Sequence, residues 1–270
     1  MRDLFMILAF LAASRGALWV VGRFERWVTP EMLRKLLHVA MGVILCPLPW
    51  VFESAWPVIV LCGIYVGLLA ARRFLVALDN HVSGILDGVG RKSLGEFLFP
   101  VSVGVLFVLA RGDRVAYLAP LLTLTFADAA AAVVGRRYGT LRYPTPGGCK
   151  SLEGSLAFAI VTFAATHLCL LLMSDAARWE SVLVAIVIAL ALTLMEAFAT
   201  GGWDNFLVPV GGLLMIKSLA GAGVPPLAVM AGIGGVAVCG LVVVYGVGWS
   251  GGDWVLARRG FPGVYSRRAK

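Results

Sequence analysis

Long runs of apolar residues, separated by short polar or Pro/Gly-containing segments, recur along the whole chain. Nine runs are found, at 4–22, 36–52, 56–71, 94–110, 115–134, 155–173, 182–200, 206–222 and 224–248. An α-helix needs about 20 mostly apolar residues to cross the hydrocarbon layer of a membrane. The pattern therefore predicts an all-α, polytopic transmembrane bundle of about nine spans.

The eighth run, 206–222, differs from the others. It contains Pro209, the adjacent Gly211 and Gly212, and Lys217. Such a segment is tolerated inside a membrane where it lines a protein cavity, so it is also compatible with a broken or re-entrant helix. In that case the helix count and the topology beyond this run would change.

Composition supports a membrane location and a single domain. Of the 270 residues, 60% are hydrophobic and 14% are charged, and the mean hydropathy is +0.91. Soluble domains carry about 25% charged residues, so this chain has too little charge to cover a water-facing surface. We expect one transmembrane domain, 1–270, and no sizeable soluble domain.

The distribution of Lys and Arg predicts the orientation of the chain. If the nine runs all cross, seventeen basic residues fall in the alternate loops and tail on one side, and four fall on the other. Basic loops stay in the cytosol, so the N-terminus is predicted outside and the C-terminus inside. This bias also accounts for the net charge of +8 without a nucleic-acid partner.

Asp128 lies within the fifth run among small residues, where an unpaired charge costs several kcal/mol. The Gly-rich, basic loop that follows, 135–155, has the composition of a phosphate site, and Asp128 could hold the accompanying Mg²⁺. A solvated basic loop is the alternative. Lys150-Ser151 is not a Walker A motif, because Cys149 stands where that motif needs glycine.

Further polar clusters are predicted on the same side of the membrane. Glu196 closes the seventh run, and Asp204 and Asn205 precede the eighth; they could complete a metal shell or orient a hydroxyl, or simply cap the next helix. Two smaller groups, each also explained as a topology marker, are Arg34, Lys35 and His38, and Arg91, Lys92 and Glu96. His38 also fits a hydrogen-bonded packing role.

These segments come in the order seen in the polyprenol kinase family. The matching segments are Arg34-Lys35-Leu36-Leu37-His38, Arg91-Lys92-Ser93-Leu94-Gly95-Glu96 with Phe99-Pro100, Ala127-Asp128 to Gly139, Lys150-Ser151-Leu152-Glu153-Gly154-Ser155, and Asp204-Asn205 before Pro209. The chain resembles that family, which includes CTP-dependent dolichol, phytol and diacylglycerol kinases, over about residues 30–215. Relatives usually have Gly where Ala127 stands.

The resemblance implies CTP as phosphoryl donor, Mg²⁺, a cytosol-facing site and a lipid alcohol as acceptor. It makes Asp128, Lys150, Ser151, Glu153, Asp204 and Asn205 the expected site residues. The related phosphatidate cytidylyltransferases end in a Gly-rich, His-containing, Asp-rich signature, and none follows Asp204 here. The kinase branch therefore fits better.

The leading hypothesis is a CTP-dependent kinase acting on an isoprenoid alcohol or on diacylglycerol. Asp128, Lys150 and Asp204 would be catalytic, with Asp204 orienting the lipid hydroxyl or taking its proton. Nucleotide contacts would come from Arg91, Lys92, Arg136, Arg137, Lys150, Ser151, Gly154 and Ser155, and metal ligands from Asp128, Glu153, Asp204 and Asn205.

Two alternatives remain open at this stage. One is a CDP-lipid synthase, which would release pyrophosphate from CTP. The other is a transporter whose Asp128, Glu196 and Lys217 line a substrate path. The sequence identifies neither the lipid nor the oligomeric state, so a homo-oligomer is also open.

Overall fold

The structure is a computed structural model that describes residues 1–78, 94–146 and 148–219. The helices are α1 (Arg2–Gly22), α2 (Pro30–Leu45), α3 (Leu48–Val51), α4 (Ala55–Leu78), α6 (Gly95–Ala110), α7 (Arg114–Leu122), α8 (Asp128–Tyr138), α9 (Leu152–Met173), α10 (Arg178–Phe198) and α11 (Asp204–Leu219). A π-helical segment, η1 (Thr123–Ala127), joins α7 to α8. Two strands, β1 (Arg142–Thr145) and β2 (Gly148–Ser151), precede α9.

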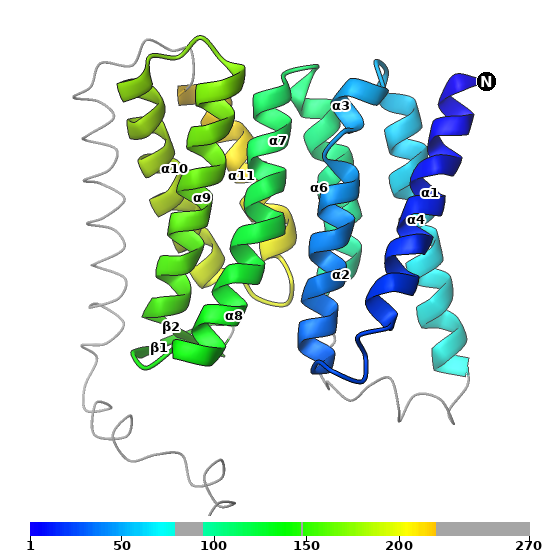
Figure 1. Ribbon diagram of the computed structural model, residues 1–270, viewed down its shortest axis with the longest axis horizontal. Coiled ribbons are helices and arrows are strands. Elements are labelled where there is room, and N and C mark those ends of the chain that lie inside the picture. The colour runs from blue at the N-terminus through cyan, green and yellow to red at the C-terminus, as the bar shows by residue number, and fades with distance from the viewer. Residues whose placement is uncertain (79–93, 147, 220–270) are drawn as a thin grey trace, which may run out of the picture.

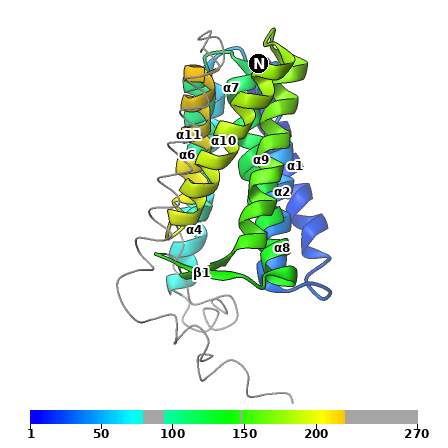
Figure 2. The ribbon, with the colours of Figure 1, turned by 90° about the vertical axis from the view of Figure 1, so that its left-hand side faces the viewer.

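The long helices lie side by side, and the chain passes repeatedly between the two ends of the bundle (Figure 1). We call one the hairpin end, because β1 and β2 lie there beneath the helices in both views (Figure 2). The other, the opposite end, carries the loops 46–54, 111–113 and 174–177. The basic residues that follow α1 and α8 therefore share the hairpin end, as the loop pattern predicts.

Among the residues that the structure describes, six helical stretches are long and apolar enough to cross a membrane: Arg2–Gly22, Pro30–Val51, Ala55–Phe74, Arg114–Tyr138, Leu152–Met173 and Arg178–Phe198. Gly95–Ala110 is a shorter apolar helix, and α11 continues through Pro209 without a break up to Leu219. The predicted run 224–248 and the end of 206–222 lie outside the described residues. The count of nine spans thus stays a prediction.

Local sequence signals mark several helix starts. The hydroxyl of Thr29 accepts a hydrogen bond from the Met32 N–H, and Pro30 occupies the first position of α2. Asp113 caps α7 by accepting from the Ala116 N–H at 3.0 Å. Such side-chain acceptors satisfy N–H groups that lack a partner at the first turn of a helix.

The predicted helical bundle is confirmed, but it carries one short β-hairpin that the sequence did not predict. Strands β1 and β2 pair antiparallel, with Arg142 opposite Ser151 and Thr145 opposite Gly148. Each strand has only four residues, which is too short for a period-two pattern of hydrophobic positions to indicate a strand in the sequence. The hairpin occupies the loop in which the sequence predicted phosphate contacts.

The buried core lies between helices, whereas large apolar side chains also cover the outer surface. Tyr117 is fully buried, and its hydroxyl donates to the Leu45 carbonyl at 2.9 Å. On the outside, side chains such as Leu68 and Ile160 are more than half exposed. An apolar outer surface on apolar helices of this length is what lipid requires, and we conclude that the chain is a membrane protein.

Candidate functional site

Asp128 is bound by a lysine from a distant helix. Lys35 Nζ, on α2, forms an ion pair with Asp128 Oδ2 at the start of α8. Both side chains are largely buried, at 9% and 14% exposure. Charges in such a place are stable only when paired, so the pair explains how an aspartate and a lysine are both accommodated between apolar helices.

The π-helical segment η1 ends immediately before Asp128. It contains one more residue per turn than an α-helix would, which rotates the following side chains by about 100°. Buried Thr125 lies within this segment and anchors it, because its hydroxyl donates to the Leu121 carbonyl at 2.7 Å. π-Helical turns are frequent at functional sites, and here one sets the direction of the Asp128 side chain.

His38 lies one turn along α2 from Lys35 and contacts the same region. Its Nε2 is 3.0 Å from the Leu124 carbonyl, and its ring lies 4.7 Å from that of Phe99. These contacts fit the packing role that the sequence left open for His38. The histidine therefore supports the wall of the site around Asp128.

Arg34 faces a different partner from its neighbour Lys35. Its guanidinium binds Glu31 at 2.7 Å, one turn earlier in α2. Arg136 of α8 approaches the same carboxylate at 3.8 Å. Glu31 thus holds two arginines from two helices at the hairpin end. Sequence reasoning missed it, although an acid in the first turn with Arg three residues later is a recognisable helix signal.

Lys150 connects the hairpin to α10. Its Nζ lies 2.5 Å from Glu196 Oε1 and also donates to the Glu196 backbone carbonyl. Glu196 is buried, whereas the Lys150 side chain is 27% exposed. Lys150 has three N–H donors, and these contacts engage two of them.

The hairpin is also attached to α9. The hydroxyls of Tyr143 and Ser155 are hydrogen-bonded at 2.5 Å. Burial raises the pKa of Tyr143, and the nearby negative charge of Glu196 acts in the same direction, so the phenol stays protonated and able to donate. Lys150 and Tyr143 together fix the hairpin across the ends of α9 and α10.

The start of α11 completes this side of the bundle. Buried Asn205 donates from Nδ2 to the Gly95 carbonyl at 2.9 Å, and the Leu94 N–H donates to the Gly201 carbonyl at 2.9 Å. These contacts join the loop before Asp204 to α6. Asn205 therefore has a structural partner in addition to its predicted role as a metal ligand.

The charges of Asp128 and Asp204 both lie within electrostatic range of Arg34 and of Glu196. The ion pair of Lys35 and Asp128 and that of Lys150 and Glu196 therefore belong to one charged region. That region gathers side chains from α2, α8, β2, α10 and α11.

The predicted glycine and serine positions have close packing contacts. Ser151 caps α9 by accepting from the Gly154 N–H at 3.2 Å. A Cβ on Gly154 would stand 3.0 Å from the Ala131 carbonyl and 3.1 Å from the Cα of Gly135. The absence of a side chain thus lets α9 approach α8 closely; contact of Ser151 and Gly154 with a nucleotide stays a prediction.

Other predicted site residues lie outside the charged region or outside the described residues. Glu153 accepts from Thr140 and from the Leu141 N–H at 3.1 Å. These residues follow the C-terminal end of α8, whereas Asp128 lies at its N-terminal end. The eleven residues of α8 span about 16 Å, so these two carboxylates do not share an ion. Glu96 and Arg137 are exposed, and Arg91 and Lys92 lie outside the described residues.

The donor set near Asp128 fits Mg²⁺ only with help from a substrate. Within the described ranges, no three His, Cys, Asp or Glu side chains gather as a metal site. Mg²⁺ is commonly held by one or two carboxylates together with substrate phosphates, however, so a protein-only cage is not required. Lys35 engages Oδ2 of Asp128, and across the described ranges Oδ1 has no hydrogen-bond partner.

Comparison with known proteins adds a relative. The chain is 28% identical to a phytol kinase from Synechocystis sp. over 189 residues, which are 68% of this chain and 78% of the relative. No protein-family model matches the chain, and no solved structure matches it significantly. The similarity to this phytol kinase supports a relationship to the polyprenol and phytol kinase family, in agreement with the sequence motifs.

Proposed function

We propose that this protein is a CTP-dependent lipid kinase that phosphorylates an isoprenoid alcohol at the cytosolic face of a membrane. The observation that carries the proposal is the charged region, which holds two ion pairs, Lys35 with Asp128 and Lys150 with Glu196, between apolar helices. A polar reaction centre beside lipid-facing helices suits an acceptor with a polar head and an apolar chain. The named activity of the relative favours an isoprenoid alcohol over diacylglycerol.

In the proposed reaction the lipid hydroxyl oxygen forms a bond to the γ-phosphorus of CTP. The bond between that phosphorus and the β–γ bridging oxygen breaks, and CDP leaves. Asp204 would orient the hydroxyl and accept its proton. Phosphoryl transfer otherwise asks the protein for positioning and for neutralisation of charge.

Positive charge for the phosphates would come from the hairpin end. Lys150 keeps one N–H donor beyond its two contacts with Glu196, and it projects from a hairpin that is attached at both strands. Arg136 and Arg137 at the end of α8 are exposed on the same side. Arg91 and Lys92, which come before α6 in the sequence, stay candidate contacts for the phosphates.

Asp128 would hold Mg²⁺ through Oδ1, and the ion would neutralise charge on the phosphates when bound. Lys35 would keep the Asp128 side chain in place and in its charged form. Asp204 and Asn205 stay candidate ligands at the edge of the region. The distance along α8 argues against Glu153 as a ligand of the same ion.

The transporter hypothesis loses support from the positions of its three residues. Asp128 and Glu196 each pair with a lysine at the hairpin side. Lys217 lies toward the opposite end, where its Nζ donates to the Leu109 carbonyl at 2.6 Å near the end of α6. The three residues thus do not line one path.

A substrate panel tests the proposal. Purified full-length protein is assayed with CTP, ATP, GTP and UTP in turn, each with phytol, a longer polyprenol and diacylglycerol. We expect phosphorylation of an isoprenoid alcohol with CTP, and little with the other nucleotides or with diacylglycerol. Equal use of ATP would contradict the assignment of CTP, and preference for diacylglycerol would contradict the acceptor.

A further inference from the structure

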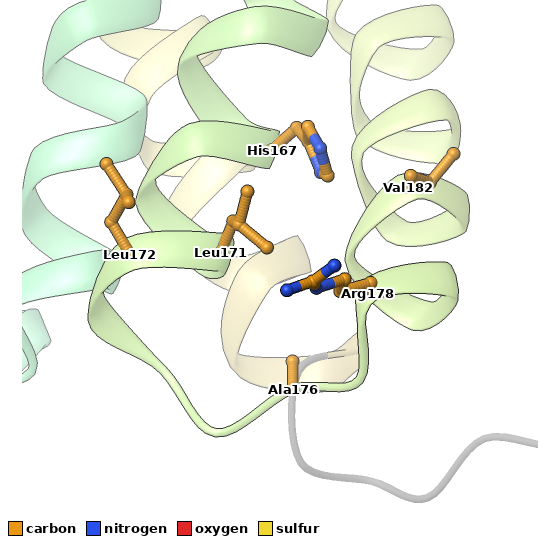
Figure 3. A pocket seen from close by; sticks show the side chains of 6 residues that line it. All are labelled: His167, Leu171, Leu172, Ala176, Arg178 and Val182. Atoms are coloured by element: carbon orange, nitrogen blue, oxygen red, sulfur yellow. The ribbon is translucent and has the colours of Figure 1, made fainter.

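A cavity at the opposite end of the bundle has no part in the proposed reaction. It lies between α9 and α10 and has a volume of ≈ 570 Å³. Its lining consists of His167, Leu171, Leu172, Ala176, Arg178 and Val182 (Figure 3). Two nitrogen-bearing side chains thus share a largely apolar cavity.

The imidazole of His167 is held in a defined orientation. Ser181 Oγ donates to the Arg178 carbonyl at 2.8 Å and lies 3.1 Å from His167 Nδ1. A hydroxyl has only one proton, so Nδ1 of His167 is the donor in the second contact. The ring also stacks on Phe163 at 5.5 Å. In the neutral imidazole this leaves Nε2 as a hydrogen-bond acceptor.

Among the described residues, the guanidinium of Arg178 has no acidic partner. It extends from α10 toward α9 in Figure 3, and no carboxylate of the described chain forms an ion pair with it. No acidic side chain lines the cavity either. Asp175 and Glu180 are nearby in sequence but are not part of the lining.

A second cavity, at the same end of the bundle, provides a contrast. It measures ≈ 350 Å³ and is lined by two arginines, Arg111 and Arg114, and by two carboxylates, Glu53 and Asp113. Its charges balance, whereas the cavity of His167 and Arg178 carries a net positive charge. Only the latter is complementary to an anion.

The cavity lies at the level where helices leave the apolar layer. The apolar helix α9 ends at Met173 and α10 begins at Arg178, which is followed by Trp179 at 55% exposure. Exposed Trp and Arg at such a boundary are typical of the membrane–water interface. Leu172, at 75% exposure, extends the apolar wall toward the surrounding lipid.

We propose that this cavity binds the headgroup of an anionic phospholipid that carries a hydroxyl, such as phosphatidylglycerol. Arg178 pairs with the phosphate, which lies at interface depth. Nε2 of His167 accepts from the headgroup hydroxyl. Leu171, Leu172 and Val182 contact the start of one acyl chain. The protein thus holds one lipid in the leaflet opposite to its reaction centre.

Native mass spectrometry of the full chain in detergent, titrated with phosphatidylglycerol and with phosphatidylcholine, tests the proposal. We expect one phosphatidylglycerol to bind preferentially, and Arg178→Gln to weaken that binding about tenfold, as expected for a charge-assisted contact. Arg114→Gln is the matched control, since Arg114 also begins a helix at this end but lines the charge-balanced cavity. It should bind like the wild type.

A second variant, Val182→Trp, fills the cavity while keeping both nitrogen-bearing side chains, and it should lose binding as well. If thermal unfolding shows that Arg178→Gln does not fold, Val182→Trp replaces it as the test variant. Equal binding of phosphatidylcholine, unchanged binding by both cavity variants, or an equal loss in Arg114→Gln would overturn the proposal. Competition by glycerol phosphate at matching concentration would identify a site for free anions and would also overturn it.

Discussion

At the scale of single residues, charges that look isolated in the sequence are paired in the structure, as Lys35 is with Asp128. Breaking a buried ion pair by removing one partner typically costs about 3–5 kcal/mol, because the remaining charge is left unpaired. Lys35 and Asp128 are exposed by only 9% and 14%, so neither charge could be kept without the other. Pairing across 93 residues of sequence therefore ties α2 to α8 at the point where chemistry is proposed.

Asp128→Asn should lower phosphoryl transfer by about 100-fold or more, because loss of a carboxylate that supports a bound metal costs several kcal/mol in the transition state. The amide still accepts a hydrogen bond from Lys35, so the protein should insert and fold, but the Lys35 charge is left unpaired and the melting temperature should fall. Initial rates of lipid phosphorylation, together with thermal unfolding in detergent, measure both effects.

Asp113→Asn is the control for this substitution. Asp113 caps α7 at the opposite end, and Asn caps a helix about as well as Asp. This variant should keep the activity and stability of the wild type. Robust activity in Asp128→Asn, at normal membrane levels, would refute the metal-binding role of Asp128.

Sequence reasoning could find some of these residues but not their partners. Asp128 and Glu196 stand out because a charge within an apolar run needs an explanation. Lys35, by contrast, resembles any basic residue at the start of a span, and Arg34 beside it differs only in its partner, Glu31. Pairing depends on how α2 packs against α8, which no local pattern encodes.

At the scale of elements, the approach of α2 to η1 determines where Lys35 meets Asp128. Gly42 on α2 faces Thr125 of η1 so closely that a Cβ would lie 2.1 Å from the Thr125 hydroxyl oxygen. Thr125 is completely buried and cannot easily move aside. Gly42 lies about two turns from Lys35, and Thr125 lies three residues before Asp128, so this contact and the ion pair belong to one interface.

Gly42→Ala should therefore destabilise the protein by about 1–3 kcal/mol, the typical cost of overpacking, and should also reduce activity. Gly63→Ala is the matched control, because Gly63 lies in α4 with no atom within 4 Å of the added Cβ. Melting temperatures of the two variants in the same detergent check the prediction. If Gly42→Ala melts like the wild type, the close approach of α2 to η1 is wrong.

The helices themselves were largely predictable, whereas the hairpin and the π-helical segment were not. Apolar runs of about 20 residues identify spans by length alone. Strands of four residues in a Gly- and Pro-rich loop leave no periodic signal, and the extra residue of η1 is invisible within a continuous apolar run. Both unpredicted features lie beside the charged region.

At the scale of the whole molecule, the two ends of the bundle differ in chemistry. The ion pairs of Lys35 with Asp128 and of Lys150 with Glu196 lie toward the hairpin end, and the opposite end carries the anion-complementary cavity. Exposed tryptophans mark both ends, with Trp27 after α1 and Trp56 at the start of α4. This arrangement fits a chain whose two ends meet different aqueous compartments.

Labelling of Cys149 tests the predicted orientation. Cys149 is exposed on β2, whereas Cys62 and Cys169 are buried and Cys46 is partly buried. In a Cys239→Ser background, a membrane-impermeant maleimide should label Cys149 only when it reaches the cytosolic side of the membrane. A Cys149→Ser, Asp175→Cys variant places the thiol in the loop at the opposite end and should label only from the other side. The reverse pattern would place the hairpin outside the cell.

The transfer of phosphate from CTP tests the central claim most directly. The purified protein is incubated with phytol, Mg²⁺ and CTP labelled either at the γ-phosphate or at the α-phosphate. We predict that the γ-label enters the lipid and that CDP is released. Entry of the α-label into the lipid with release of pyrophosphate would instead show transfer of CMP to the alcohol, and it would contradict the proposed kinase reaction.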